Sequence, residues 1–219
     1  MRDSLNNRQV TPVAIVDDDY LFRSLARKYV SRLAGFSIVF EAADGGECIK
    51  KMEAAAVLPA IIILDIAMYP MGGFKAIKIL KAKCPQVKIL VLSVHCRDYC
   101  LHYMLHNRAN GFLSKAAMPG LPAAMVCLAD NEIYYSELVT PDLYDKIKKG
   151  EIQIPEMTGM EMEIANYLNT DMVHKEIADK LNIGIRTLEK HLEHLYKKFE
   201  LHSRNAFLSF AIKNEMLSP

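Results

Sequence analysis

The chain has 219 residues, of which 51% are hydrophobic, and a formal net charge of +1. That length fits one large or two small domains, with enough apolar side chains for a core in each. No apolar run reaches the length of a membrane span and the N-terminus lacks a signal-peptide core, which predicts a cytoplasmic protein with no membrane association. The five cysteines form no Cys-x-x-Cys pair, which argues against a disulfide or zinc framework.

Short apolar stretches alternate with helical patterns five times after a polar tail, residues 1–11. The predicted strands are residues 13–16, 37–43, 61–65, 88–93 and 111–115. The predicted helices cover residues 20–33, a segment around 48–52, and residues 74–84, 99–106 and 121–128. In the first helix, Leu21, Leu25 and Tyr29 are spaced by four. The alternation predicts an α/β domain over residues 12–130, with a flavodoxin-like, doubly wound, five-stranded parallel sheet.

The pattern changes after about Asp130. Residues 131–154 mix charges with prolines and a glycine, and are predicted to form a linker with a short helix. In residues 155–219 apolar side chains recur at helical spacing in four short groups, and no strand pattern returns. This part of the sequence predicts a second, small all-α domain.

Five polar residues end or follow predicted strands: Asp17, Asp18, Asp65, Ser93 and Lys115. Because the carboxyl ends of parallel strands meet at one edge, these side chains are expected in one pocket. Taken singly each has an ordinary explanation, since Asp65 suits a turn or a helix cap and Lys115 suits the surface. Together, three mutually repelling carboxylates favour a hard divalent cation, Mg²⁺, as counter-charge. The lysine and the hydroxyl suit phosphoryl oxygens, so the set predicts phosphoryl transfer to Asp65.

Residues 12–130 resemble the receiver domain of two-component response regulators in the spacing of these five residues. The resemblance implies that Asp65 accepts a phosphoryl group from a phosphohistidine on a cognate histidine kinase. It also implies that Asp18, Asp65 and the backbone carbonyl of Ala67 bind Mg²⁺, with Asp17 assisting, often through water.

The same resemblance assigns the switch residues. Ser93 is expected to be the switch hydroxyl, and Phe112 the aromatic residue that turns inward after phosphorylation, while Lys115 contacts the phosphoryl group. Two positions depart from the usual receiver pattern: Tyr69 stands where the loop usually has proline, and Ala116 stands where proline often follows the lysine.

Another class of protein also uses an aspartate nucleophile. Phosphatases of the haloacid-dehalogenase type need a second aspartate two residues later as general acid, and here that position is Ala67. We therefore expect no enzyme activity beyond acceptance of the phosphoryl group and its slow loss.

The helical tail has helix-turn-helix spacing around residues 182–185. Residues 156–206 resemble the LuxR/NarL-type helix-turn-helix, from Met157-Thr-Gly-Met-Glu161 to Arg204. The resemblance implies a transcription regulator that binds double-stranded DNA and forms a homodimer when phosphorylated. The residues expected at DNA are Lys175, Arg186, Thr187, Glu189, Lys190, His194, Lys197 and Lys198. Those expected at the dimer contact are Phe207, Phe210 and Ala211.

The charge of this tail is unusual for a DNA-binding domain. Residues 156–219 carry eight Lys/Arg and ten Asp/Glu, a net charge of −2. At helical spacing, however, Arg186, Lys190, His194 and Lys197 fall opposite the leucine stripe, so the outward face is basic. The net negative charge of residues 156–219 leaves an alternative open, in which the helical domain binds a protein partner rather than DNA.

Glu189 lies on the shoulder of that face, where many members of the family carry lysine. It has two interpretations. Its carboxylate can accept a hydrogen bond from cytosine N4 and determine specificity. Alternatively it takes part in pairing within the helix, where Glu193 and Lys197 are best placed for an i,i+4 ion pair.

Overall fold

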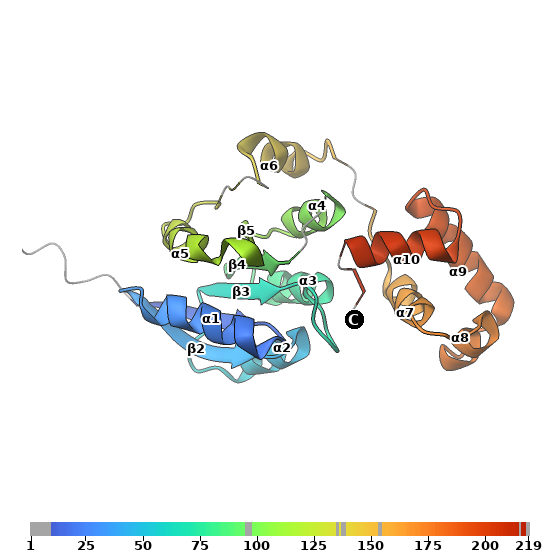
Figure 1. The fold of residues 1–219 in the computed structure, drawn as a ribbon, viewed down its shortest axis with the longest axis horizontal. Coiled ribbons are helices and arrows are strands. Elements are labelled where there is room, and N and C mark those ends of the chain that lie inside the picture. Colours follow the sequence, from blue (N-terminus) through green and yellow to red (C-terminus); the bar gives the residue numbers. More distant parts are fainter. Residues whose placement is uncertain are drawn as a thin grey trace, which may run out of the picture.

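The computed structural model describes residues 10–94, 98–134, 136, 139–152, 155–214 and 216–217. The predicted tail, residues 1–11, lies almost entirely outside these residues. A β-sheet domain and a helical domain lie side by side along the long axis of the molecule (Figure 1).

The N-terminal domain is built on a parallel sheet of five strands in the order β2-β1-β3-β4-β5. The strands are β1 (Thr11–Val16), β2 (Phe36–Ala42), β3 (Ile61–Asp65), β4 (Lys88–Ser93) and β5 (Gly111–Ser114). This is the flavodoxin-like order, so the predicted fold class is confirmed. Every residue of β3 is buried, as expected for a central strand covered on both faces.

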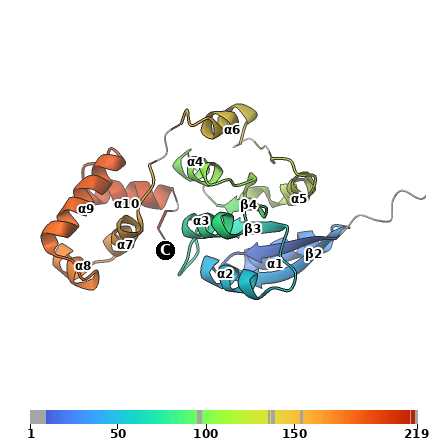
Figure 2. The same cartoon turned by 180° about the vertical axis from the view of Figure 1, so that it is seen from behind.

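Helices cover both faces of the sheet (Figures 1 and 2). On one face lie α1 (Tyr20–Ser31) and α5 (Leu121–Ala129), and on the other lie α2 (Gly45–Ala54), α3 (Gly73–Lys83) and α4 (Asp98–His106). Successive side chains of a strand point to opposite faces of the sheet, so β3 contributes side chains to two separate hydrophobic cores. Ile61 and Ile63 pack with α1 and α5, whereas Ile62 and Leu64 pack with α2, α3 and α4.

Two boundaries differ from the predicted ones because side chains cap helices there. The Asp44 carboxylate accepts hydrogen bonds from the backbone N–H groups of Gly46 and Glu47, so α2 begins at Gly45, before the segment predicted around 48–52. The Ser114 hydroxyl accepts from the N–H of Ala116, which ends β5 one residue early. Lys115 thus begins the 3₁₀ segment η1 (Lys115–Gly120) instead of ending a strand.

The predicted linker contains one helix, α6 (Pro141–Lys148), whose first turn is capped by the Thr140 hydroxyl. This helix packs against α4. Just before it, the backbone of Tyr134 bridges to Gly111 of β5. The start of the linker therefore pairs with the end of β5, and its helix lies against α4.

The C-terminal domain consists of α7 (Gly159–Leu168), α8 (His174–Lys180), α9 (Ile185–Lys198) and α10 (Arg204–Lys213), which confirms the predicted all-α domain. Its core contains the leucine stripe of α9, Leu188, Leu192 and Leu195. Thr158 and Glu161 form a capping box that fixes the start of α7. Within the described residues, none of the helices is long and apolar enough to cross a bilayer.

Candidate phosphorylation site and DNA-binding surface

Three carboxylates meet at the carboxyl edge of the sheet. Asp65 ends β3, and Asp17 and Asp18 follow β1, its hydrogen-bonded neighbour. One carboxylate oxygen from each of the three lies within 4.8 Å of the others. Asp17 and Asp65 are buried, whereas Asp18 is exposed at the mouth of the cluster. The expected convergence of strand ends therefore holds for these three side chains.

Lys115 supplies the positive charge of the cluster. Its Nζ lies 2.8 Å from Asp17 Oδ2 and 3.1 Å from Asp65 Oδ2, and its side chain is 5% exposed. The ammonium also lies 4.6 Å from the ring centroid of Phe22 in α1, within the range of a cation–π contact. The lysine is thus held between two carboxylates and an aromatic face, and it does not extend into solvent.

Burial changes the proton affinity of Asp65, Asp17 and Lys115. Burial, followed by the charge of Asp17, raises the pKa of Asp65 to about 7. Burial also raises the pKa of Asp17, against the opposing effect of Lys115. For Lys115 burial alone would lower the pKa, but the charges of Asp65 and Asp17 outweigh it and raise the pKa above its usual value. One lysine therefore does not compensate the two buried carboxylates.

The carboxylates fit a hard cation. Among the described residues, Asp17 Oδ2 receives no well-directed hydrogen bond, although the Lys115 ammonium is 2.8 Å away. An underbonded buried carboxylate oxygen, next to two further carboxylates and open to solvent at Asp18, has the donor chemistry that Mg²⁺ prefers. Asp17, Asp18 and Asp65 could therefore hold the ion, and Ala67 lies two residues beyond Asp65 in the adjacent loop.

The loop after β3 folds back closely on the strand. The Gly73 N–H donates to the carbonyl of Ile66 at 2.8 Å, and a Cβ at position 73 would lie 2.5 Å from the carbonyl oxygen of Asp65. Only glycine fits at that distance. In the same loop the Tyr69 N–H lies 3.3 Å from Asp18 Oδ2, which ties the loop to the mouth of the cluster.

The two predicted switch residues lie in the interior. Ser93 ends β4, next to β3, and is fully buried. Phe112 is also fully buried, in the same core as the inner face of α4 and Val139 of the linker. The Phe112 ring is thus enclosed in this structure, and its expected turn after phosphorylation stays a prediction.

Two residues near the cluster were not predicted from the sequence. Phe22 lies beneath Lys115, and Arg23 donates to the backbone carbonyl of Asp17 while pairing with Glu41 at 3.5 Å. Leu21 and Leu25 have the spacing that predicts the buried face of this helix, but Leu21 is 75% exposed. Both residues lie in the first turn of the helix that follows Asp17 and Asp18. Side chains at that position reach the edge of the sheet, and this placement could have predicted their contact with the cluster.

The second candidate site is the outer surface of α9. Arg186, Lys190, His194 and Lys197 are all exposed in this helix. Thr187 and Glu189 are also exposed, as is Lys175 in α8. Within the described part of the chain, Glu189 makes no ion pair, and neither do Glu193 and Lys197. The pairing interpretation is therefore not seen, and the Glu189 carboxylate faces solvent.

Lys198 has a different environment from its neighbours on α9. Its ammonium pairs with the buried Glu161 of α7 and donates to the backbone carbonyl of Glu156 at 2.9 Å. These bonds hold the end of α9 against α7. The ammonium is directed into the domain in this structure, away from the surface where a DNA phosphate would bind, contrary to the expectation for this residue.

The three expected dimer residues of α10 also separate in the structure. Phe207 and Ala211 are fully buried in the core of their own domain. Phe210 is half-buried and packs against Tyr99 of α4, with ring centroids 5.6 Å apart. Two of the three therefore serve the fold of the helical domain, because the 3.6-residue period places 207 and 211 on its inner face.

Both domains match known families. Residues 13–126 match the response regulator receiver domain, and residues 156–211 match the bacterial regulatory proteins of the luxR family. The nitrate/nitrite response regulator protein NarL of Escherichia coli is 27% identical over 205 residues, covering 91% of this chain and 94% of NarL. The transcriptional regulatory protein DegU of Brevibacillus brevis is 25% identical over 233 residues, covering 98% of each chain.

Solved structures show the same fold. A structure of the RcsB response regulator of Salmonella typhimurium aligns with a TM-score of 0.66 and 23% identity, covering 94% of this chain and 98% of that chain. RcsB of Salmonella enterica serovar Typhimurium bound to promoter rprA aligns with a TM-score of 0.64 and 22% identity, covering 91% and 97%. The chain belongs to the response regulator family, as a transcription regulator of the NarL/LuxR type with a receiver domain and a LuxR-type DNA-binding domain.

Proposed function

We propose that the protein is switched by phosphorylation of Asp65 by a cognate histidine kinase in the cytoplasm, and that the phosphorylated form dimerises and binds promoter DNA. The observation that carries the proposal is the buried arrangement of Lys115 between Asp17 and Asp65. An ion-pair network used only for stability has no need of two carboxylates with raised pKa values.

In the transfer step, a carboxylate oxygen of Asp65 attacks the phosphorus atom of the donor. A P–O bond forms as the P–N bond of the donor phosphohistidine breaks, and the histidine nitrogen leaves with the bonding electron pair. The Lys115 ammonium, already 3.1 Å from Asp65, neutralises charge on the phosphoryl oxygens. Ser93, at the end of the adjacent strand, is proposed to donate a hydrogen bond from its hydroxyl to one of those oxygens.

Asp17, Asp18, Asp65 and the backbone carbonyl of Ala67 are the groups proposed to hold Mg²⁺. When bound, the ion supplies positive charge to the carboxylates and to the phosphoryl oxygens. Its charge also favours the ionised form of Asp65, which is the nucleophilic form.

Labelling by acetyl phosphate tests the receiver part of the proposal. The wild-type protein should take up one phosphoryl group only in the presence of Mg²⁺, and Asp65→Asn should take up none. Asp145→Asn removes an exposed carboxylate on α6 and should label as the wild type does. Equal labelling of the Asp65→Asn protein would show that another residue is the acceptor.

DNA binding is proposed for the exposed face of α9, with Arg186 and Lys190 as phosphate or base contacts. Retention of promoter DNA should fall as salt rises, and should fall further in Arg186→Ala and Lys190→Ala. Lys148→Ala, on the exposed surface of α6, is the matched control. Unchanged retention in both α9 variants would favour the alternative, a protein partner for the helical domain, which its net charge of −2 supports.

A further inference from the structure

A half-buried lysine lies at the edge of the sheet opposite the carboxylate cluster. Lys81, near the end of α3, donates from its Nζ to the backbone carbonyl of Val87 at 2.6 Å and to Asn110 Oδ1 at 2.9 Å. Val87 directly precedes β4 and Asn110 directly precedes β5, so both acceptors lie where these strands begin. The Lys81 side chain therefore joins α3 to the amino edge of the sheet.

The surroundings of Lys81 do not favour a positive charge. Within the part of the chain that the structure describes, this lysine makes no ion pair with a carboxylate, whereas Lys83, two residues further along α3, pairs with Glu53. The charge that acts on Lys81 is that of Arg108, which has the same sign and lies between α4 and β5. Burial, followed by this like charge, lowers the pKa of Lys81 to about 8.

The hydrogen bonds of Lys81 also match a neutral amine. An ammonium group has three N–H donors, and a neutral amine has two N–H donors and one lone pair. Val87 and Asn110 supply two acceptors, which satisfy both donors of the amine and leave its lone pair in the third direction. The polar contacts and the charge surroundings thus favour the same form of the group, and that form is a nucleophile.

We propose that Lys81 is a covalent modification site, at which the free amine takes an acyl group from an activated donor, a thioester or an acyl phosphate. Nζ attacks the carbonyl carbon of the donor and a C–N bond forms. The bond from that carbon to the sulfur or oxygen of the leaving group breaks, and the leaving group keeps the electron pair. The proton that the nitrogen loses passes to the leaving group or to water. This reaction does not require phosphorylation of Asp65, so it stands apart from the proposed function.

The structure indicates what acylation would disturb. Asn110 Oδ1 also accepts from the backbone N–H of Ile89 at 3.0 Å, and the Asn110 carbonyl accepts from the N–H of Tyr134, at the start of the linker, at 2.9 Å. An acylated Lys81 keeps a single N–H and no charge, so one of its two acceptors loses its donor. Acylation would therefore act on the point that ties α3, the start of β4 and the linker together, far from the carboxylate cluster.

Mass spectrometry of the full-length protein tests the site after treatment with acetyl-coenzyme A in one arm and with acetyl phosphate in EDTA in the other. At pH 7.5 roughly a quarter of a group with a pKa of about 8 is free amine, compared with about one in a thousand of an ordinary lysine. Lys81 should therefore be acetylated roughly five times as fast as the exposed Lys75 of the same helix, or faster. The rate at Lys81 should level off above about pH 8. Labelling in a single arm would support the proposal and identify the donor class.

Two variants separate the effect of these surroundings from simple accessibility. Asn110→Asp places a carboxylate beside the amine and should slow acetylation of Lys81 by roughly tenfold at pH 7.5. Arg108→Asn removes the like charge, and asparagine accepts the positive φ of 65° at this position, so this variant replaces the first if that one fails to fold. It should slow the reaction by roughly twofold. Arg32→Asn, which removes an exposed arginine at the end of α1, should react as the wild type does.

Two results would overturn the proposal. The first is a Lys81 that is acetylated no faster than Lys75 in either arm. The second is a rate at Lys81 that stays the same in the folded Asn110→Asp and Arg108→Asn proteins, because a lysine that reacts only through exposure would not respond to these charges.

Discussion

Replacement of Asp65 by asparagine should stabilise the protein at neutral pH, because the folded state encloses this carboxylate without enough positive charge. The pKa of Asp65 is raised from 3.8 to about 7. Below about pH 4 the carboxyl group is protonated in both the folded and the unfolded protein, and the raised pKa then carries no penalty. As the pH rises through the pKa of the folded protein, that favourable contribution to folding stability is lost. At about 1.4 kcal/mol per pKa unit, the ionised carboxylate costs roughly 4 kcal/mol at pH 8. Asparagine has no such cost.

The assay is urea unfolding in EDTA at several pH values, comparing wild type with Asp65→Asn. The free energy of unfolding of Asp65→Asn, relative to that of the wild type, should rise by roughly 2 to 3 kcal/mol between pH 5 and pH 8. Mg²⁺ at pH 8 should recover much of this difference by stabilising the wild type. Asp145→Asn should follow the wild type at every pH. Parallel pH profiles for wild type and Asp65→Asn would refute the account of Asp65 as an undercompensated buried charge.

Four further outcomes are expected for the DNA-binding domain. Lys198→Met should lower the unfolding free energy of the protein by about 2 kcal/mol in urea, because it leaves the buried Glu161 without its partner, and it should not alter the salt dependence of DNA binding. Lys190→Ala should reduce the slope of log K against log salt by about 1 if it contacts a phosphate, as measured by fluorescence anisotropy. Glu189→Lys should raise affinity for random-sequence DNA and weaken selection for cytosine in a binding-site selection. Acylation of Lys190, followed by mass spectrometry, should be equally fast in wild-type and Tyr99→Ala protein, and faster labelling of the variant would show that the receiver covers α9.

The carboxylate cluster could be predicted from the sequence because it depends on topology alone. Asp17 and Asp65 follow apolar runs, and in a parallel sheet every such run ends at the same edge. Lys115 was placed correctly at that edge although it lies in η1 rather than in β5, because one residue of difference in a strand end hardly moves the lysine head group. The cation–π contact with Phe22 depends on a rotamer choice, which no sequence pattern encodes.

The helical domain was harder to predict, because the period of a helix shows which residues share a face but not what covers that face. Lys198 is adjacent to Lys197 in sequence, yet it is turned to the opposite environment by the buried Glu161. Phe207 and Phe210 are both aromatic and three residues apart, and one is enclosed in its own domain while the other meets Tyr99. Each outcome is set by a partner distant in sequence.

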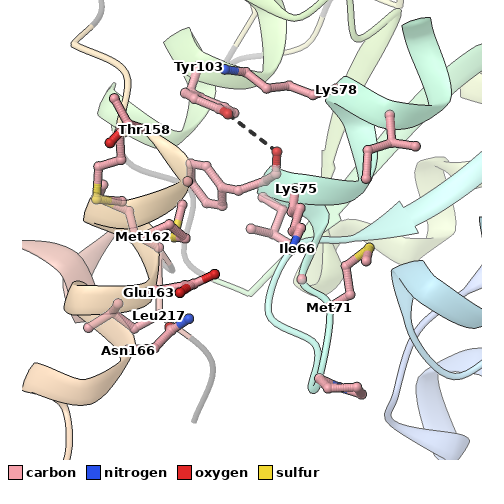
Figure 3. Close-up of a pocket in the computed structure, with 17 residues that line it drawn as sticks. Ile66, Met71, Lys75, Lys78, Tyr103, Thr158, Met162, Glu163, Asn166 and Leu217 are labelled. Carbon is pink, nitrogen blue, oxygen red and sulfur yellow. Dashed lines mark hydrogen bonds between the residues drawn. The ribbon is translucent and has the colours of Figure 1, made fainter. Parts of the chain in front are cut away.

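The positions of the acids also explain how a domain with a net charge of −2 can have a basic outer surface on its recognition helix. Glu161 is buried against Lys198, and Glu156 pairs with Lys78 of α3 in the receiver. Glu163 points into the cavity between the domains, opposite the receiver wall that carries Lys75 (Figure 3). These acids lie inside the domain or on the side that meets a lysine-bearing helix of the receiver, away from the outer face of α9. These three acids therefore add no negative charge to the outer face of α9, where Glu189 and Glu193 are the exposed acids. The local charge of α9, and not the sum over the domain, is the quantity that decides its affinity for DNA.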